Sequence, residues 1–176
     1  MCIRDRLLCF PLPIYFAVTA QAAGQEVFAP VILDPNAVPI QPDDEEITPP
    51  PEEITSTNAS FIMNAEMWVG TENYAGSAGL RCPTWSSRGF VATVRVTAAD
   101  LARIGYETEE KYITLYQSGL ISPGYGVDVI TLGALPDGTR LPAGEYELSV
   151  LLEFYDIETN EKSAVNTVVP LEVTIS

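Results

Sequence analysis

The stretch that decides the fold is Glu145-Tyr146-Glu147-Leu148-Ser149-Val150-Leu151-Leu152-Glu153-Phe154-Tyr155. Apolar side chains alternate along it with mostly acidic ones, with a period of two. Such alternation is typical of a β-strand that turns one face to an apolar core and the other to water. We therefore expect residues 145–155 to form one strand of a sheet that is solvated on its outer face.

Further strands are predicted before this one. Residues 90–96 alternate in the same way, so that one face carries Phe90, Ala92, Val94 and Val96. Shorter runs of strand-favouring residues occur at 61–69, 112–117 and 127–132. The sequence Thr97-Ala98-Ala99-Asp100 is typical of a capped helix start, and predicts one short helical turn near residues 98–104.

The last predicted strand ends at the C-terminus. Its inward face is expected to carry Val165, Val169, Leu171, Val173 and Ile175. Pro170 lies within it and has no N–H to donate, which argues for an edge position or a bulge. Roughly seven short strands with regularly spaced turns predict an all-β fold, a single antiparallel β-sandwich, with a closed small barrel as the alternative.

A resemblance supports the sandwich. Leu141-Pro142-Ala143-Gly144-Glu145-Tyr146-Glu147-Leu148 resembles a strand entry of immunoglobulin-like and fibronectin-III-like modules in exported proteins of Gram-positive bacteria. The resemblance implies that Tyr146 is a structural corner whose hydroxyl bonds to the preceding backbone. Residues 116–124, followed by the strand at 127–132, resemble a recurrent pattern in exported proteins of Gram-positive gut bacteria. The likeness covers about residues 110–175 and implies a fold but no activity.

The N-terminal region predicts export. Residues 1–6 resemble the translated end of a transposon used to prepare sequencing libraries, and we interpret them as an artefact. Residues 7–23 carry no charge and end in Ala20-Gln21-Ala22, the small-x-small pattern of a signal-peptidase site. We expect residues 1–23 to be a signal peptide, which places the protein outside the cell or at its surface. The alternative is an uncleaved N-terminal membrane anchor.

The remaining chain divides into a linker and a domain. Residues 24–57 contain seven prolines between Pro30 and Pro51 together with acidic runs, so a disordered, acidic linker is predicted. It could act as a spacer or as a leader without a spacing role. The predicted sandwich domain occupies residues 58–176.

Composition excludes several function classes. The net charge of −15 opposes binding to phosphate backbones, so we expect no nucleic-acid partner. The chain has no histidine, which removes Ser-His-Asp and Cys-His catalysis. No phosphate-binding loop, CxxC pair or nucleophile elbow occurs, and we expect no cofactor. Cys82 is the one cysteine after the predicted signal peptide, and burial as a small apolar side chain is expected for it.

Aromatic residues offer the main candidate contacts. Trp85 and Tyr125 lie in loops rich in Gly, Ser and Pro and are the preferred candidates for binding a glycan or a protein. Trp68, Tyr74 and Tyr106 could join such a patch. For these three we favour structural roles, Trp68 in the core and the tyrosines over sheet edges.

Charged residues offer weaker candidates. Asp156, Glu158 and Asn160 could supply oxygens to calcium, but the spacing and glycine of an EF-hand are absent. Glu145, Glu147 and Glu153 share a strand face at spacings compatible with glycoside hydrolysis, although a solvated outer face is the preferred interpretation. Lys111 and Lys162 could in principle form isopeptide cross-links, and neither has an evident partner.

Taken together, these patterns predict a non-catalytic extracellular or cell-surface module. It would either present a sheet face or a loop end to an extracellular protein or glycan partner, or serve as a structural part of a larger surface protein. Carbohydrate binding through exposed aromatic residues is the first alternative. Glycoside hydrolysis is the second.

Overall fold

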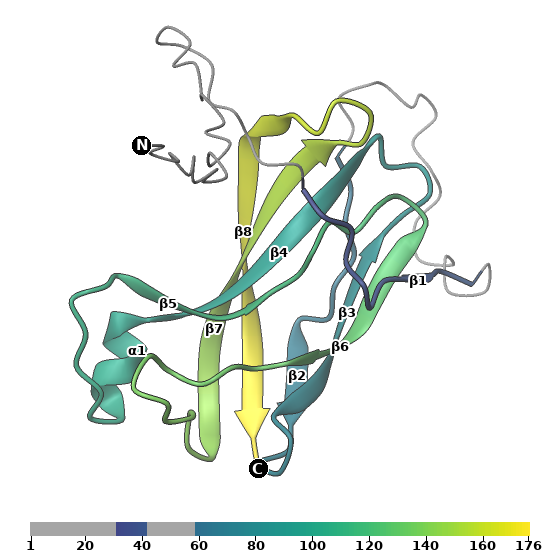
Figure 1. Cartoon of the computed structure of the whole chain (residues 1–176). Coiled ribbons are helices and arrows are strands. Elements are labelled where there is room, and N and C mark those ends of the chain that lie inside the picture. The colour runs from purple at the N-terminus through teal and green to yellow at the C-terminus, as the bar shows by residue number, and fades with distance from the viewer. Residues whose placement is uncertain (1–30, 42–58) are drawn as a thin grey trace, which may run out of the picture.

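The alternating stretch at residues 145–155 lies in the middle of a five-stranded sheet (Figure 1). The computed structural model describes residues 31–41 and 59–176. Within these ranges, the elements in chain order are β1 (Val38–Pro39), β2 (Glu66–Val69), β3 (Ala75–Cys82), β4 (Arg88–Thr97), α1 (Ala98–Arg103), β5 (Tyr112–Gln117), β6 (Tyr125–Thr131), β7 (Gly144–Asp156) and β8 (Lys162–Ile175).

The strands form two sheets. One has the order β2-β8-β7-β4-β5, in which β2 runs parallel to β8 and every other neighbouring pair is antiparallel. The other has the order β1-β6-β3 and is antiparallel. The chain before β2 crosses from one sheet to the other, because Ile62 exchanges two backbone hydrogen bonds with Arg81 of β3 before β2 joins β8. The predicted all-β sandwich with one short helix is confirmed.

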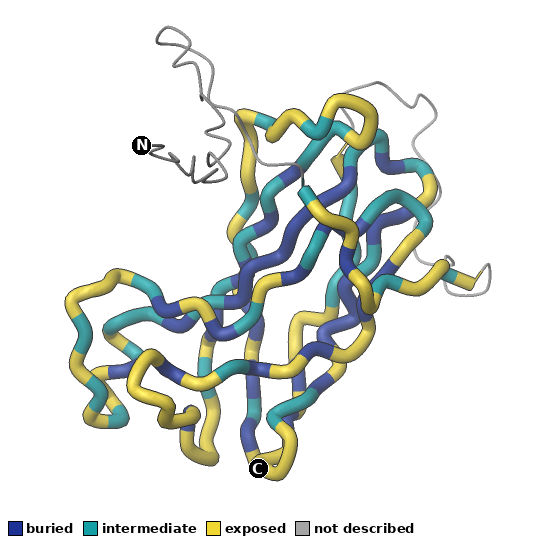
Figure 2. Tube along the Cα trace, viewed as in Figure 1, coloured by how far each residue is buried: buried dark blue, intermediate teal, exposed yellow. Residues whose placement is uncertain are grey.

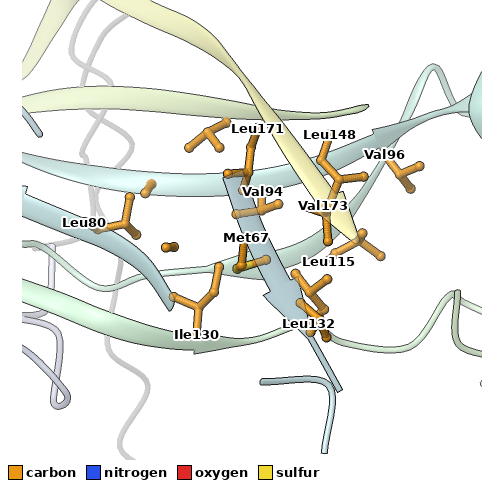
Figure 3. Close-up of a cluster of buried hydrophobic side chains, with 14 of the residues drawn as sticks. Met67, Leu80, Val94, Val96, Leu115, Ile130, Leu132, Leu148, Leu171 and Val173 are labelled. Carbon is orange, nitrogen blue, oxygen red and sulfur yellow. The ribbon is translucent and has the colours of Figure 1, made fainter. Parts of the chain in front are cut away.

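The core lies between the sheets, and Figure 3 shows side chains of both sheets pointing into it. On β4 the predicted inward residues Phe90, Ala92, Val94 and Val96 are at most 1% exposed. On β7 the predicted inward face is buried from Leu148 to Phe154. The outer face of β4 departs from the expected pattern, since Val91 and Thr93 are also buried. As β4 is flanked by β5 and β7, side chains of both neighbours can cover its outer face.

The helix follows the predicted cap. The Thr97 hydroxyl accepts a hydrogen bond from the Asp100 amide at 3.1 Å and donates one to the Asp100 carboxylate at 2.6 Å. Leu101 is buried against the core, and the helix ends at Arg103. The predicted helical turn is confirmed.

The last strand matches its prediction in part. Leu171, Val173 and Ile175 are buried, but Val165 is 67% exposed, so its predicted place on the inward face is wrong. Val165 lies near the β7–β8 turn, where the pairing register shifts between Glu153 and Tyr155 and the strands run past the core (Figure 2).

Pro170 lies at an edge, as predicted. β2 pairs with β8 only from Glu172 onward, so the first part of β8 has β7 as its paired neighbour among the described residues. The Glu172 amide donates to the Ala65 carbonyl on the β2 side. Because N–H direction alternates along a strand, position 170 also faces that side, and the proline removes no hydrogen bond from the β7 ladder.

The predicted linker needs a correction over residues 31–41, which we name the strap. The strap packs along the sandwich, where Leu33 bridges Leu120 and β1 pairs with β6 (Figure 1). Its backbone therefore finds partners at strand edges, and composition alone does not reveal such pairing. The remainder of the predicted linker, residues 24–30 and 42–57, and the predicted signal peptide lie outside the described residues.

Candidate functional site

The structure brings the loops of the two predicted contact residues to the same end of the three-stranded sheet. Tyr125 begins β6 and is paired in register with Cys82 at the end of β3. The Gly124 amide donates to the Cys82 carbonyl at 2.8 Å. Trp85 follows three residues after Cys82 and is half-buried, whereas Tyr125 is 42% exposed. The two aromatic residues thus belong to adjoining loops.

Sequence reasoning missed the strap as a neighbour of Tyr125. Four large apolar side chains are exposed on the strap and the start of β6, where they form what we name the strap surface: Ile32 at 80%, Leu33 at 62%, Val38 at 57% and Tyr125 at 42%. Asp34-Pro35-Asn36 between two apolar runs is the turn signal that could have indicated a paired segment here.

Two shallow hollows flank the strap. The first, about 220 Å³, is lined by Leu33, Asp34, Ala37, Leu120, Ser122 and Tyr125. The second, about 370 Å³, is lined by Val38, Pro39, Ile40, Gln41, Arg81, Gly126 and Asp128. Each combines apolar side chains with a carboxylate. A surface of this kind suits a partner that offers apolar groups together with hydrogen-bond donors.

Asp34 anchors the strap. Its side chain is 7% exposed and accepts hydrogen bonds from the Gly119 amide at 2.7 Å and from the Asn36 amide at 2.8 Å. Burial, together with the charge of Asp34, raises the pKa of Tyr116 to about 12. The Asp34 carboxylate is thus held by backbone donors at the junction between the strap and the end of β5.

The remaining aromatic candidates have separate positions. Trp68 is 68% exposed, so its predicted core position is wrong: Met67 and Val69 take the inward positions of β2, and strand alternation turns Trp68 outward. Tyr74 donates a hydrogen bond to the Leu141 carbonyl at 2.9 Å, and the Arg140 guanidinium lies over its ring. Tyr106 packs partly against the core.

Tyr146 makes the backbone contact that the resemblance implies. Its hydroxyl donates to the Pro142 carbonyl, four residues earlier, at 2.9 Å. Burial raises the pKa of this phenol, with a smaller contribution from Tyr74. Tyr146 thereby fixes the entry into β7, which is a structural role.

The three glutamates of β7 do not share one environment. Glu145 and Glu147 are exposed, and with Glu172, Tyr146, Val173 and Thr174 they line an open hollow of about 360 Å³. Glu153 forms a salt bridge with Lys162. Glycosidases work with two carboxylates that face each other in a desolvated cleft. The exposed pair on this sheet face lacks that setting.

In the predicted calcium turn, a carboxylate oxygen of Asp156 binds backbone amides of the turn itself. One carboxylate oxygen of Asp156 accepts hydrogen bonds from the amides of Glu158 and Thr159, both at 3.0 Å. These bonds hold the pKa of Asp156 below its usual value. Asn160 adopts a positive φ of 58° and completes the tight turn. Within residues 31–41 and 59–176, no three His, Cys, Asp or Glu side chains gather to hold a metal ion.

Cys82 is fully buried. Its thiol contacts the Arg88 carbonyl at 3.3 Å, and burial raises its pKa to about 12 despite the opposing effect of Ser86. A thiol that stays protonated is a poor nucleophile, so Cys82 acts as an apolar core residue.

The helices of the described residues and the comparisons with known proteins complete the description of the site. No helix in the described part of the chain is long and apolar enough to cross a membrane. No protein-family model, curated protein or solved structure matches this chain.

Proposed function

We propose that this chain is a non-catalytic extracellular or cell-surface interaction module that binds its partner through the strap surface. The observation that carries the proposal is the gathering of Ile32, Leu33, Val38 and Tyr125 as exposed apolar side chains on adjoining elements. Exposed large apolar side chains on paired elements of an acidic protein are a common feature of interaction sites. The partner is an extracellular protein or glycan.

An immunoglobulin-like topology is part of the proposal. In its support, the chain before β2 pairs first with β3 and then in parallel with the last strand, β8. The Tyr146 hydrogen bond at the entry to β7 supports it as well. Sandwiches of this class serve widely as binding modules and present loops or sheet faces to their partners.

The export part of the proposal rests on residues 7–23. Mass spectrometry of the protein recovered from culture medium should give a mature N-terminus after Ala22 or Ala23. A chain that retains these residues in the membrane fraction would instead support the uncleaved anchor.

The binding part can be tested with separated polysaccharide and protein fractions of a Gram-positive cell envelope, each immobilised and probed with the purified full-length chain. We expect retention on one fraction, with a double variant, Leu33→Glu and Val38→Glu, losing it. Val165→Glu with Val168→Glu is the matched control, because these valines are also exposed but lie on β8. Equal retention of the two double variants, or no retention of the wild type, would contradict the proposal.

A glycan is the second candidate partner, and the adjoining loops of Trp85 and Tyr125 favour it. Tyr and Trp side chains combine a large apolar ring face with a hydrogen-bonding group, which suits them to contact the apolar faces and hydroxyl groups of a sugar. On a glycan array, Trp85→Ala and Tyr125→Ala should each lose signal, whereas Trp68→Ala on β2 should keep it. Loss with Trp68→Ala alone would move the site to the five-stranded sheet.

A further inference from the structure

The strap occupies a strand edge that is built to receive it. The Leu120 amide donates to the Ile32 carbonyl at 2.8 Å, and the Asp34 amide donates to the Leu120 carbonyl at 3.0 Å. Further along, the Ile40 amide donates to the Gly124 carbonyl at 2.9 Å. The strap therefore crosses from the edge of one sheet to the edge of the other, and we name the edge that receives it, residues 118–126, the acceptor edge.

At Gly119, the strap backbone packs so closely on the acceptor edge that no Cβ atom could be accommodated. A Cβ atom at this position would lie 2.6 Å from the Asp34 Cα atom, 2.7 Å from the Asp34 nitrogen and 2.9 Å from the Ile32 carbonyl oxygen. All three neighbours belong to the strap. A side chain on residue 119 would thus collide first with the strap, which supplies the three atoms nearest to the added Cβ atom.

The strap itself contributes little to the core. Ile32, Leu33 and Val38 are exposed, and Ala37 packs against the core as a partly buried residue. Its attachment rests mainly on backbone hydrogen bonds and on Asp34. Segments with few buried apolar contacts open at low free-energy cost, and an opened strap would leave an unpaired edge.

We propose that the acceptor edge also takes the strap of a second copy of this chain, so that two copies exchange straps. A reciprocal exchange keeps every hydrogen bond between strap and edge, because each edge still receives an identical segment. Residues 42–58 join the strap to the domain, and a chain of this length spans up to about 60 Å when extended. That reach lets a strap arrive at the edge of a neighbouring copy.

The strap of a chain competes with the straps of other chains for the same edge. Tethering through a short linker gives an effective concentration of about 1 mM. Exchange therefore becomes appreciable when copies are crowded to a comparable concentration, as they are on a surface. This assembly is independent of the partner binding proposed above, and the experiment below measures only contacts between copies.

Mixed cysteine variants of the full-length chain test the exchange. One chain carries Pro39→Cys on β1, and the other carries Tyr125→Cys on β6, since these two residues pair in register. Directly paired antiparallel residues lie at a Cα separation that a disulfide can bridge. Cys2 and Cys9 are replaced by serine, while the buried Cys82 is kept. The two chains are unfolded, mixed, refolded together at millimolar concentration and mildly oxidised.

The expected result is a disulfide-linked product with the mass of two chains, one of each kind. Ala143→Cys in place of Tyr125→Cys is the collision control, as Ala143 is exposed and lies in the loop before β7. A single chain carrying both Pro39→Cys and Tyr125→Cys should close a disulfide within itself. If it does so while the mixture yields no more linked product than the control, straps stay in their own chains and the proposal is wrong. Failure of the double variant to close would overturn the pairing on which the proposal rests.

Gly119→Ala tests which of the two linked chains donates its strap and which receives it. In the Tyr125→Cys chain it blocks the acceptor edge, so the mixed product should be lost. In the Pro39→Cys chain it leaves the donated strap intact, so the mixed product should remain. Equal yields from the two combinations would show that the linked product comes from collision, and would overturn the exchange.

Discussion

Gly119 and Asp34 approach so closely that a Cβ atom on Gly119 would lie 2.6 Å from the Asp34 Cα atom. The Gly119 amide also donates to the Asp34 carboxylate at 2.7 Å. One glycine thus admits the strap backbone and binds its buried carboxylate. This contact explains how a proline-rich segment with exposed apolar side chains is held on the sandwich.

Gly119→Ala should release the strap without unfolding the domain. We expect much faster hydrogen exchange at the amides of Asp34 and Ile40, because their acceptors lie on the edge that the strap would leave. Amides of β7 should keep their protection. Gly70→Ala is the matched control, as its nearest neighbour to a new Cβ atom is 3.8 Å away. Unchanged exchange at Asp34 and Ile40 in the Gly119 variant would refute this account.

The sequence could predict the sandwich because alternation with a period of two is unambiguous on a strand with one solvated face. β7 is such a strand, and its inward residues from Leu148 to Phe154 are buried as predicted. On β4 the same alternation predicts only the buried inward face. The strand is flanked on both sides, and outer-face residues such as Val91 and Thr93 are therefore buried as well.

The strap could not be predicted from composition. Prolines and acidic residues around it indicate a linker, yet a strand edge can bind any backbone that offers amides and carbonyls in register. The predicted core position of Trp68 is wrong because several apolar residues in 61–69 allow either alternate set of side chains to face the core. Hydrophobicity then favours the set that buries the tryptophan. The parallel pairing of Trp68 with Thr174 settles the register.

Adjacent substitutions in β2 test that register. Met67 is 1% exposed and Trp68 is 68% exposed. Met67→Ala should lower the free energy of unfolding by about 2–5 kcal/mol, because it leaves a cavity in the core. Trp68→Ala should cost under about 1 kcal/mol, as expected of an exposed position. Urea unfolding of the two variants measures both, and a larger loss for Trp68→Ala would contradict the assigned register.

Alkaline pH should destabilise the fold through the buried Cys82 and the half-buried Tyr116. Burial raises the pKa of Cys82 from 9.0 to about 12, and burial with Asp34 raises the pKa of Tyr116 from 10.0 to about 12. The unfolded chain therefore loses these protons at lower pH than the folded chain does. Their contribution to the free energy of unfolding is fully present below about pH 9 and is lost as the pH rises toward about 12.

The thiol alone contributes up to roughly 4 kcal/mol of this loss, from three pK units at about 1.4 kcal/mol each. Urea unfolding at a series of pH values above about 8 should show the decline. In Cys82→Ala the decline should be shallower, although the variant is less stable at neutral pH. Parallel curves for wild type and variant would mean that Cys82 does not carry the effect.

A row of like charges crosses the outer face of the five-stranded sheet. Glu147 lies directly opposite Glu172, which in turn pairs with Glu66. Like charges in directly opposed positions destabilise a sheet, and opposite charges contribute roughly 0.2–1 kcal/mol. Glu147→Lys should therefore raise the free energy of unfolding by about that amount at low salt, and the gain should shrink as salt screens the charges. Glu109→Lys makes the same change of net charge in an exposed loop outside the sheet. If both variants gain equally, the benefit comes from the overall charge of −15 and not from the row.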